Sequence, residues 1–199
     1  YICSGNTLLN RVSTVDRITF PFDSGTAVQV GTLSGVRRSL SANNSSTHGY
    51  ICGGNDGTGS HTIIDRITFP FDSGTASHVG NLTISRQRLS ANNSSTHGYI
   101  CGGHATANYS IIDRFTFPFD SGTASHVGNL SGTRGGMLTN NSSAYGYVCG
   151  GHNGSTYLSI IERFAFPFNS GTASSVGNLS GSKGYTEATD NVDFVSQFI

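Results

Sequence analysis

The sequence predicts an all-β protein built from four copies of one unit of about 49 residues. The nineteen residues "IDRITFPFDSGTASHVGNL" that begin at Ile64 return nearly unchanged from Ile112, and weaker copies begin at Val15 and Ile161. A second landmark, "YICGG" or a close variant, recurs at intervals of 49, 49 and 48 residues. Gly, Ser, Thr and Asn are abundant and good helix formers are scarce, which is typical of short strands and turns.

Each unit contains short apolar segments bounded by turn residues, as the second copy shows. "GYICGG" predicts a strand that ends in a double glycine, and the segment Ile63 to Phe71 alternates with the period of two that marks a strand. "DSGT" predicts a hairpin turn, because Asp72 can bond backbone amides and Gly74 can supply a positive φ. Since the fourth copy has Asn169 at the Asp position, a turn is favoured over a metal site. "ASHVGNL" and "RQRLSANNSSTH" complete the unit as two more strands.

Four strands per unit, repeated, is the pattern of a β-propeller blade. We expect one propeller domain over residues 1–199, with blades that start near Tyr1, Tyr50, Tyr99 and Tyr147. The last copy departs from the repeat, and residues 190–199 predict a strand that closes its own ring or adds to another subunit. Whether more blades precede the first one, in a larger ring or assembly, stays open.

Seven residues of the second copy carry a resemblance to a known family: Tyr50, Gly53, Gly54, Asp65, Arg66, Phe71 and Asp72. In their order and spacing they resemble the kelch repeat, which implies a kelch-like propeller. The Trp that this repeat usually carries is missing, and its place falls at or near His78, His126, Gln29 and Ser175. The packing between blades must therefore come from the Phe pairs. The amino-acid sequence of the repeats also looks like that of uncharacterised proteins from aquatic bacteriophages and environmental sequences.

An acid–Arg dipeptide occurs in every copy, as Asp16-Arg17, Asp65-Arg66, Asp113-Arg114 and Glu162-Arg163. Neighbours on a strand face opposite sides, so the two cannot pair within one blade. We expect the acid of one blade to meet the Arg of the next as a structural ion pair, because an acid among Ile and Phe needs a partner. Four carboxylates poised for acid–base catalysis are the alternative. The presence of the pair in every blade favours the structural role.

The cysteines also occupy equivalent positions: Cys3, Cys52, Cys101 and Cys149. Packed sheets lie about 10 Å apart, whereas a disulfide needs Cα atoms within about 7 Å. We expect buried free thiols, and no CxxC spacing supports a zinc site.

Kelch-like propellers also occur in copper oxidases of the galactose-oxidase type, which use Tyr, His and Cys. His48, Tyr50 and Cys52 offer those residue types. Alternation puts Tyr50 and Cys52 on one strand face, where blade packing is the usual role. The sequence therefore predicts no catalytic residue, no metal site and no cofactor, and the oxidase stays a remote alternative.

The loops after the double glycine differ most between copies, and variation on a fixed scaffold is where a ligand would be recognised. The candidate ligand residues are Asn55, Asp56, His61, His104, Asn108, Tyr109, His152, Asn153 and Tyr157. Glycosylation sequons occur at Asn43, Asn44, Asn81, Asn92, Asn93, Asn108, Asn129, Asn140, Asn141, Asn153 and Asn178. They matter only for a chain that enters a glycosylating pathway, and polar turn surface is the favoured interpretation.

Charge and hydropathy narrow the function classes. The net charge is zero and only 11% of residues are charged, which argues against a nucleic-acid surface. No apolar run approaches 18 residues, so no membrane insertion is expected. We expect a non-enzymatic structural or adhesive module of a virion or an extracellular assembly, which associates with itself or with other structural proteins. A glycan- or protein-binding propeller is the alternative.

Overall fold

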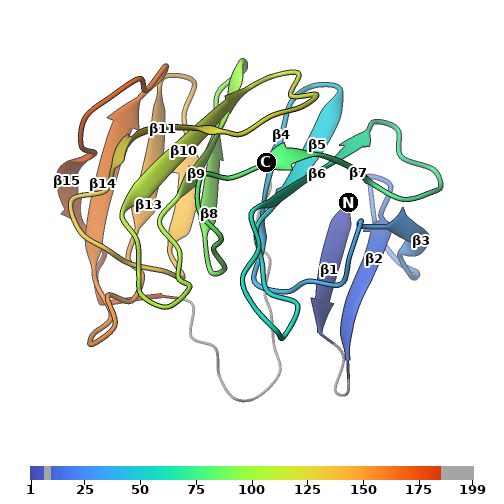
Figure 1. Ribbon diagram of the computed structural model, residues 1–199, viewed down its shortest axis with the longest axis horizontal. Helices are drawn as coiled ribbons and strands as arrows, with labels where there is room; N and C mark the ends of the chain where they lie inside the picture. Colours follow the sequence, from blue (N-terminus) through green and yellow to red (C-terminus); the bar gives the residue numbers. More distant parts are fainter. Residues whose placement is uncertain (7–9, 185–199) are drawn as a thin grey trace.

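The computed structural model describes residues 1–6 and 10–184. All regular secondary structure in these ranges is β-strand, in four antiparallel sheets that stand side by side (Figure 1). The first sheet contains β1 (Ile2–Asn6), β2 (Arg11–Arg17) and β3 (Val28–Thr32). The second contains β4 (Ser41–Asn44), β5 (His48–Cys52), β6 (Ile63–Thr68) and β7 (Ser77–Asn81). The third contains β8 (Ser90–Asn93), β9 (His97–Cys101), β10 (Ile111–Thr116) and β11 (Ser125–Asn129). The fourth contains β12 (Leu138–Asn141), β13 (Tyr145–Cys149), β14 (Ile160–Ala165) and β15 (Ser174–Asn178).

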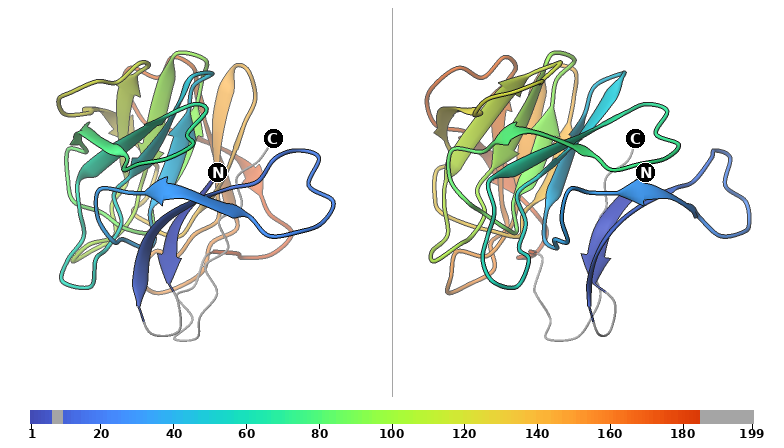
Figure 2. Two further views of the ribbon diagram at one scale, coloured as in Figure 1. Left: turned by 90° about the vertical axis from the view of Figure 1, so that its right-hand side faces the viewer. Right: turned by 45° about the vertical axis from the view of Figure 1, so that its right-hand side comes forward.

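The predicted all-β fold with four propeller blades is confirmed. Each sheet is a meander in which sequential strands pair, and β4, β8 and β12 lie next to one another at the inner edge (Figure 2). In the described residues the first sheet has three strands, since no strand corresponding to β4 pairs with β1. The closing strand predicted at 190–199 lies outside the described residues. No described helix is long and apolar enough to cross a membrane.

The strand expected from Ile63 to Phe71 ends earlier, at Thr68. The physical reason is Pro70, which has no amide hydrogen with which to continue the ladder. The last backbone bond before it runs from the Phe69 amide to the Thr47 carbonyl, at 2.8 Å. The predicted turn follows, and Gly74 has the expected positive φ of 105°.

The Phe pairs pack between blades, as the missing Trp requires. Tyr50 is fully buried and stacks on Phe117 of the next blade at 5.2 Å between ring centroids. Its hydroxyl accepts a hydrogen bond from the Phe119 amide at 2.9 Å. Tyr1 and Tyr99 make the same stacking contact and the same hydrogen bond with the blades that follow them. The aromatic contacts therefore lie between blades and join each one to the next.

A glycine in the outermost strand lets each blade approach the next. A Cβ atom on Gly80 would stand 2.7 Å from a ring carbon of Phe119 and closer still to the Gly122 carbonyl oxygen. That carbonyl accepts the Asn81 amide at 2.9 Å, and the Ala124 amide donates back to the Asn81 carbonyl at 2.8 Å. Gly31 and Gly128 are equally crowded at the other two interfaces. Only glycine fits at this contact.

The inner strands are joined by buried asparagines. The Asn43 side-chain amide donates to the Asn92 carbonyl at 2.6 Å, and that of Asn92 donates to the Asn140 carbonyl at 2.9 Å. Asn43 is 2% exposed and Asn92 is fully buried. These two sequons are therefore wrong as glycosylation sites of the folded chain, because their amide nitrogens are enclosed and bonded. The other sequons are half-buried or exposed and stay a prediction.

Candidate functional site

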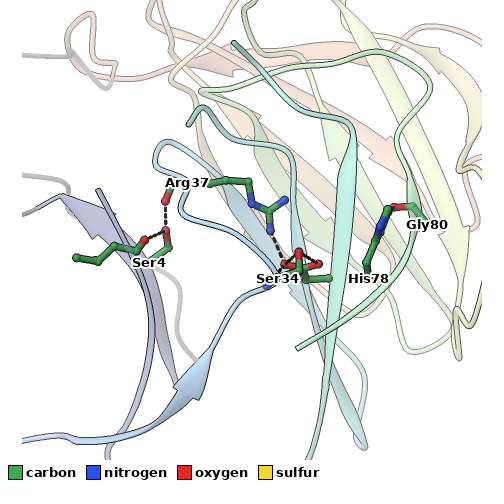
Figure 3. A network of polar contacts seen from close by, with 7 residues as sticks. Ser4, Ser34, Arg37, His78 and Gly80 are labelled. Atoms are coloured by element: carbon green, nitrogen blue, oxygen red, sulfur yellow. Dashed lines mark hydrogen bonds and ion pairs between the residues drawn. The ribbon is translucent and has the colours of Figure 1, made fainter. Parts of the chain in front are cut away.

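The acids of the repeated dipeptides lie in buried ion pairs between blades. The Asp65 carboxylate accepts a bond from Arg37 Nη2 at 2.6 Å, and both side chains are at most 1% exposed. Ser34 adds bonds from its amide at 3.1 Å and its hydroxyl at 2.7 Å. Figure 3 shows Arg37 pointing toward the carboxylate beside Ser34, while its own carbonyl accepts from Ser4. Both oxygens of this buried carboxylate therefore accept hydrogen bonds.

The same arrangement recurs at the next two interfaces. Asp113 pairs with Arg86 at 2.6 Å and accepts from Thr83, and Glu162 pairs with Arg134. Burial lowers the pKa of Arg86, and the charge of Asp113 opposes that effect. In each case the guanidinium comes from the connector, the segment that links the outermost strand of one blade to the inner strand of the next.

The predicted pairing of dipeptide acid with dipeptide Arg is therefore wrong in its partners. Arg66 bonds Asp120 in the turn of the next blade, Arg17 bonds Asp72 likewise, and Arg114 bonds the Asn169 side-chain oxygen. The reason is the strand alternation itself. The acid faces the preceding connector, so the Arg faces the following blade and reaches only its turn.

Sequence reasoning missed the three connector arginines: Arg37, Arg86 and Arg134. They recur at the repeat spacing, each three residues after a Ser or Thr that also bonds the acid. That recurrence was the available signal. The fourth copy has Lys183 at this position.

The Cys and Tyr side chains serve packing. All four cysteines are free; Cys52, Cys101 and Cys149 are buried, and Cys3 is half-buried. Burial raises the pKa of Cys101 to about 12 and that of Cys3 to about 11, so both thiols stay protonated at neutral pH. Tyr50, considered above as a copper ligand, lies under Phe117 with its hydroxyl bonded to a backbone amide. No cluster of three or more His, Cys, Asp or Glu that could hold a metal occurs in the described part of the chain.

The variable loop of the second blade is held by its own polar side chains. The Asp56 carboxylate accepts from the Thr58 hydroxyl and amide and from the Gly59 amide, at 2.7 to 3.0 Å. These bonds, the hydroxyl first, lower its pKa, and His61 lies 2.9 Å away. The Asn55 side chain accepts from the Gly57 amide at 2.7 Å. The structure thus brings together Asp56 and His61, and uses them mainly to shape the loop.

The loops of the third and fourth blades meet. The Asn108 side-chain amide donates to the His152 carbonyl at 3.0 Å. The Tyr157 ring packs edge-on against the His152 ring at 4.8 Å and is 38% exposed. Asn153 is exposed and caps its turn through bonds from the amides of residues 155 and 156. An open hollow of about 540 Å³ adjoins this loop and includes Asn153 in its lining.

The two remaining candidates contribute backbone bonds to their loop. The His104 amide donates to the Gln87 carbonyl at 2.8 Å, which ties the loop to the connector. The Tyr109 amide donates to the Gly103 carbonyl at 2.8 Å, and its side chain is half-buried. Asn108, His152 and Tyr157 thus lie together where the third and fourth loops meet, and Asn55, Asp56 and His61 share the loop of the second blade.

No family model matches the chain, and no curated protein matches it. Among solved structures it is similar to the protein described as "Structure of YjhT", with a TM-score of 0.72 at 9% sequence identity. The match covers 86% of this chain and 61% of that protein, so the chain spans less than two thirds of its length. At this identity the likeness shows the propeller-like fold alone.

Proposed function

We propose that the chain is a non-enzymatic, kelch-type structural or adhesive module of an extracellular or virion assembly. The supporting observation is that the side chains best suited to chemistry are used between blades. Asp65, Asp113 and Glu162 are fully buried in ion pairs, and the acid–Arg positions repeat from blade to blade. An enzyme site breaks the symmetry of a repeat, whereas a scaffold keeps it. The uncharged Ser, Thr and Asn surface fits a protein outside the cell.

The proposed virion role rests on the likeness of the repeat sequences to those of bacteriophage proteins. The assignment to the kelch type rests on the order of the motifs within each repeat. Both are parts of the proposal. The departure from the kelch pattern, the absent Trp, is offset physically by the Tyr–Phe stacking between blades.

The test is to assay the purified chain for ordered association and for copper. The chain is incubated with Cu²⁺, dialysed and analysed for metal, and then imaged by negative-stain electron microscopy. A structural module gives defined assemblies and negligible copper. One copper per chain with oxidation of an alcohol would overturn the proposal and favour the oxidase.

A glycan-binding propeller is the second candidate, and the exposed Tyr157 favours it. The Tyr157 ring packs against that of His152, and an exposed aromatic ring suits the apolar face of a sugar. The neighbouring Asn153 and Leu158 help to line an open hollow. Glycan-array binding that is lost in Tyr157→Ala and kept in Tyr109→Phe would support this candidate.

A further inference from the structure

The three interfaces between blades repeat one set of contacts. An aromatic ring covers a glycine of the outer strand, a turn carbonyl accepts the amide after that glycine, and a cation reaches the acid of the next blade. In addition, the Arg of each acid–Arg dipeptide bonds a side chain in the hairpin turn of the next blade. Each blade therefore has two unlike faces, one that offers the glycine and one that offers the ring.

The fourth blade presents its glycine face without a covering blade in the described residues. We call the surface formed by the exposed or half-buried residues Tyr147, Arg163, Val176, Gly177, Asn178 and Lys183 the glycine face. Val176 is 45% exposed, whereas its equivalent Val79 is 8% exposed. No described atom lies within 4 Å of a Cβ built on Gly177. Arg163 lies over the Tyr145 ring of its own blade. The equivalent arginines of the first three blades instead bond the turn of the next blade.

The first blade lies at the other end of the row (Figure 1) and carries the residues that correspond to the covering side of an internal interface. We call Asp16, Phe20, Phe22, Asp23 and Gly25 the ring face. Phe20 is 73% exposed and Phe22 is 44% exposed, although their equivalents pack against Tyr and Gly in later blades. Asp16 is half-buried, and its equivalents in the other blades are fully buried.

We propose that the glycine face of one copy binds the ring face of a second copy, head to tail. This inference deepens the structural role proposed above and rests on it. The repeat defines the contacts: Phe22 of one copy covers Gly177 of the other, and Lys183 reaches Asp16 as Arg37 reaches Asp65. The charges are complementary, since the glycine face carries Lys183 and Arg163 and the ring face carries Asp16 and Asp23.

The contact is heterologous, because the two surfaces differ. Such contacts form rings when the rotation closes and filaments when it does not. Lys183 offers a point charge in place of the forked guanidinium of the internal interfaces, so this contact is weaker than those within the chain.

The decisive experiment blocks each face separately and then mixes the blocked proteins. Gly177→Ala adds a methyl group to the glycine face at a site with free space in the single chain. Phe22→Lys removes the exposed ring and places a cation on the face that would meet Lys183 and Arg163 of the second copy. Gly132→Ala is the matched control, since it also lies in open space and on neither face. Light scattering after size exclusion measures the mass from about 1 µM to about 1 mM.

We expect the wild type and Gly132→Ala to form oligomers and each blocked variant to be monomeric. An equimolar mixture of the two blocked variants has one intact contact and should give a dimer and nothing larger. Association that survives in Gly177→Ala would overturn this interface and leave the structural role standing. A wild type that stays monomeric over the whole range would overturn the inference and weaken the proposed function with it.

Discussion

At the scale of single residues, this molecule is held by a few buried polar contacts that recur in each blade. Asp65 is fully buried yet has a cation and a hydroxyl within bonding distance. A buried ion pair of this kind adds little over apolar residues of the same shape, but the loss of one partner is costly. Its effect is to fix how each connector is placed against the next blade.

Replacing Arg86 with Met should strand the buried carboxylate of Asp113. We expect a loss of about 3–5 kcal/mol in the free energy of unfolding, measured by urea titration. Arg66→Leu is the control, because its partner Asp120 is 67% exposed and the pair contributes about 0–1 kcal/mol. Equal losses in the two variants would contradict the assignment of the buried pair.

Gly80→Ala should destabilise the chain by about 1–3 kcal/mol, because the new methyl group overlaps the turn and ring of the next blade. Gly177→Ala is chemically identical and meets open space in the single chain, so its effect should stay within about 0.5 kcal/mol. Both are measured by thermal unfolding at a concentration where the chain is monomeric. If the two midpoints agreed, the close approach between blades would be wrong.

At the scale of strands, the inner edge is more polar than its position suggests. β4 and β8 each carry an asparagine whose side chain donates to the backbone of the next inner strand, β8 and β12 respectively. These bonds are directional, so they fix the height of one strand against the next, which apolar packing alone does not do. The repeated "SANN" marks these strands in the sequence without revealing which Asn is buried.

Asn92→Ala removes a side-chain amide that donates to the Asn140 carbonyl, the Tyr147 carbonyl and the Asn141 side chain. We expect a loss of about 1–3 kcal/mol, since the hydrogen bonds of a fully buried side-chain amide are removed. Asn93→Ala, one residue further along the same strand and half-buried, is the matched control. The measurement is urea unfolding, and a larger effect from Asn93 would reverse the assigned orientation of β8.

The strands β5, β9 and β13 each bury a thiol, which gives the fold an alkaline limit. An unfolded thiol has a pKa near about 8.5, whereas burial raises the pKa of Cys101 to about 12. Between these values the unfolded state releases a proton that the folded state keeps. Stability is therefore complete below about pH 8.5 and falls above it, by up to about 1.4 kcal/mol per pH unit for each such thiol.

Urea titrations at pH 8 and pH 10 test this. In Cys101→Ala the free energy of unfolding should fall less between the two pH values, because one buried thiol no longer contributes. The window ends at pH 10 because Tyr50 and Tyr99, whose pKa values burial also raises, contribute above it. Equal stability at both pH values would show that the thiols ionise freely in the folded chain.

At the scale of the whole molecule, four blades form a row with two unlike ends. The chain matches the fold of YjhT over 61% of that protein's length. Phe20 is exposed at one end and Val176 at the other, whereas the equivalent Phe residues of later blades are half-buried and the equivalent Val residues of earlier blades are buried. In the described residues one surface of each kind is left uncovered, and the association proposed above uses there the same contacts that join blades within the chain.

A charge exchange tests the paired ends. Lys183→Glu alone or Asp16→Lys alone should weaken self-association, because each places like charges opposite one another across the contact. The double variant should associate again, since it restores opposite charges in reverse order. Sedimentation velocity measures the assembly, and circular dichroism confirms that each variant is folded. If the double variant did not associate again, Lys183 of one copy and Asp16 of the next would not be in contact.

The sequence by itself determined the four copies of the repeat, the strand-rich fold and the presence of aromatic packing between blades. These follow from local periodicity and turn chemistry, which the order of residues carries directly. Only the tertiary structure decided the partners. Asp65 pairs with Arg37 rather than with a dipeptide Arg, Asn92 is buried although polar surface was expected there, and Gly80 of its predicted strand is a close contact with the next blade. The alternation of residues along a strand predicts which side of the sheet each side chain faces. Which residue it contacts on that side depends on how the connectors run between blades.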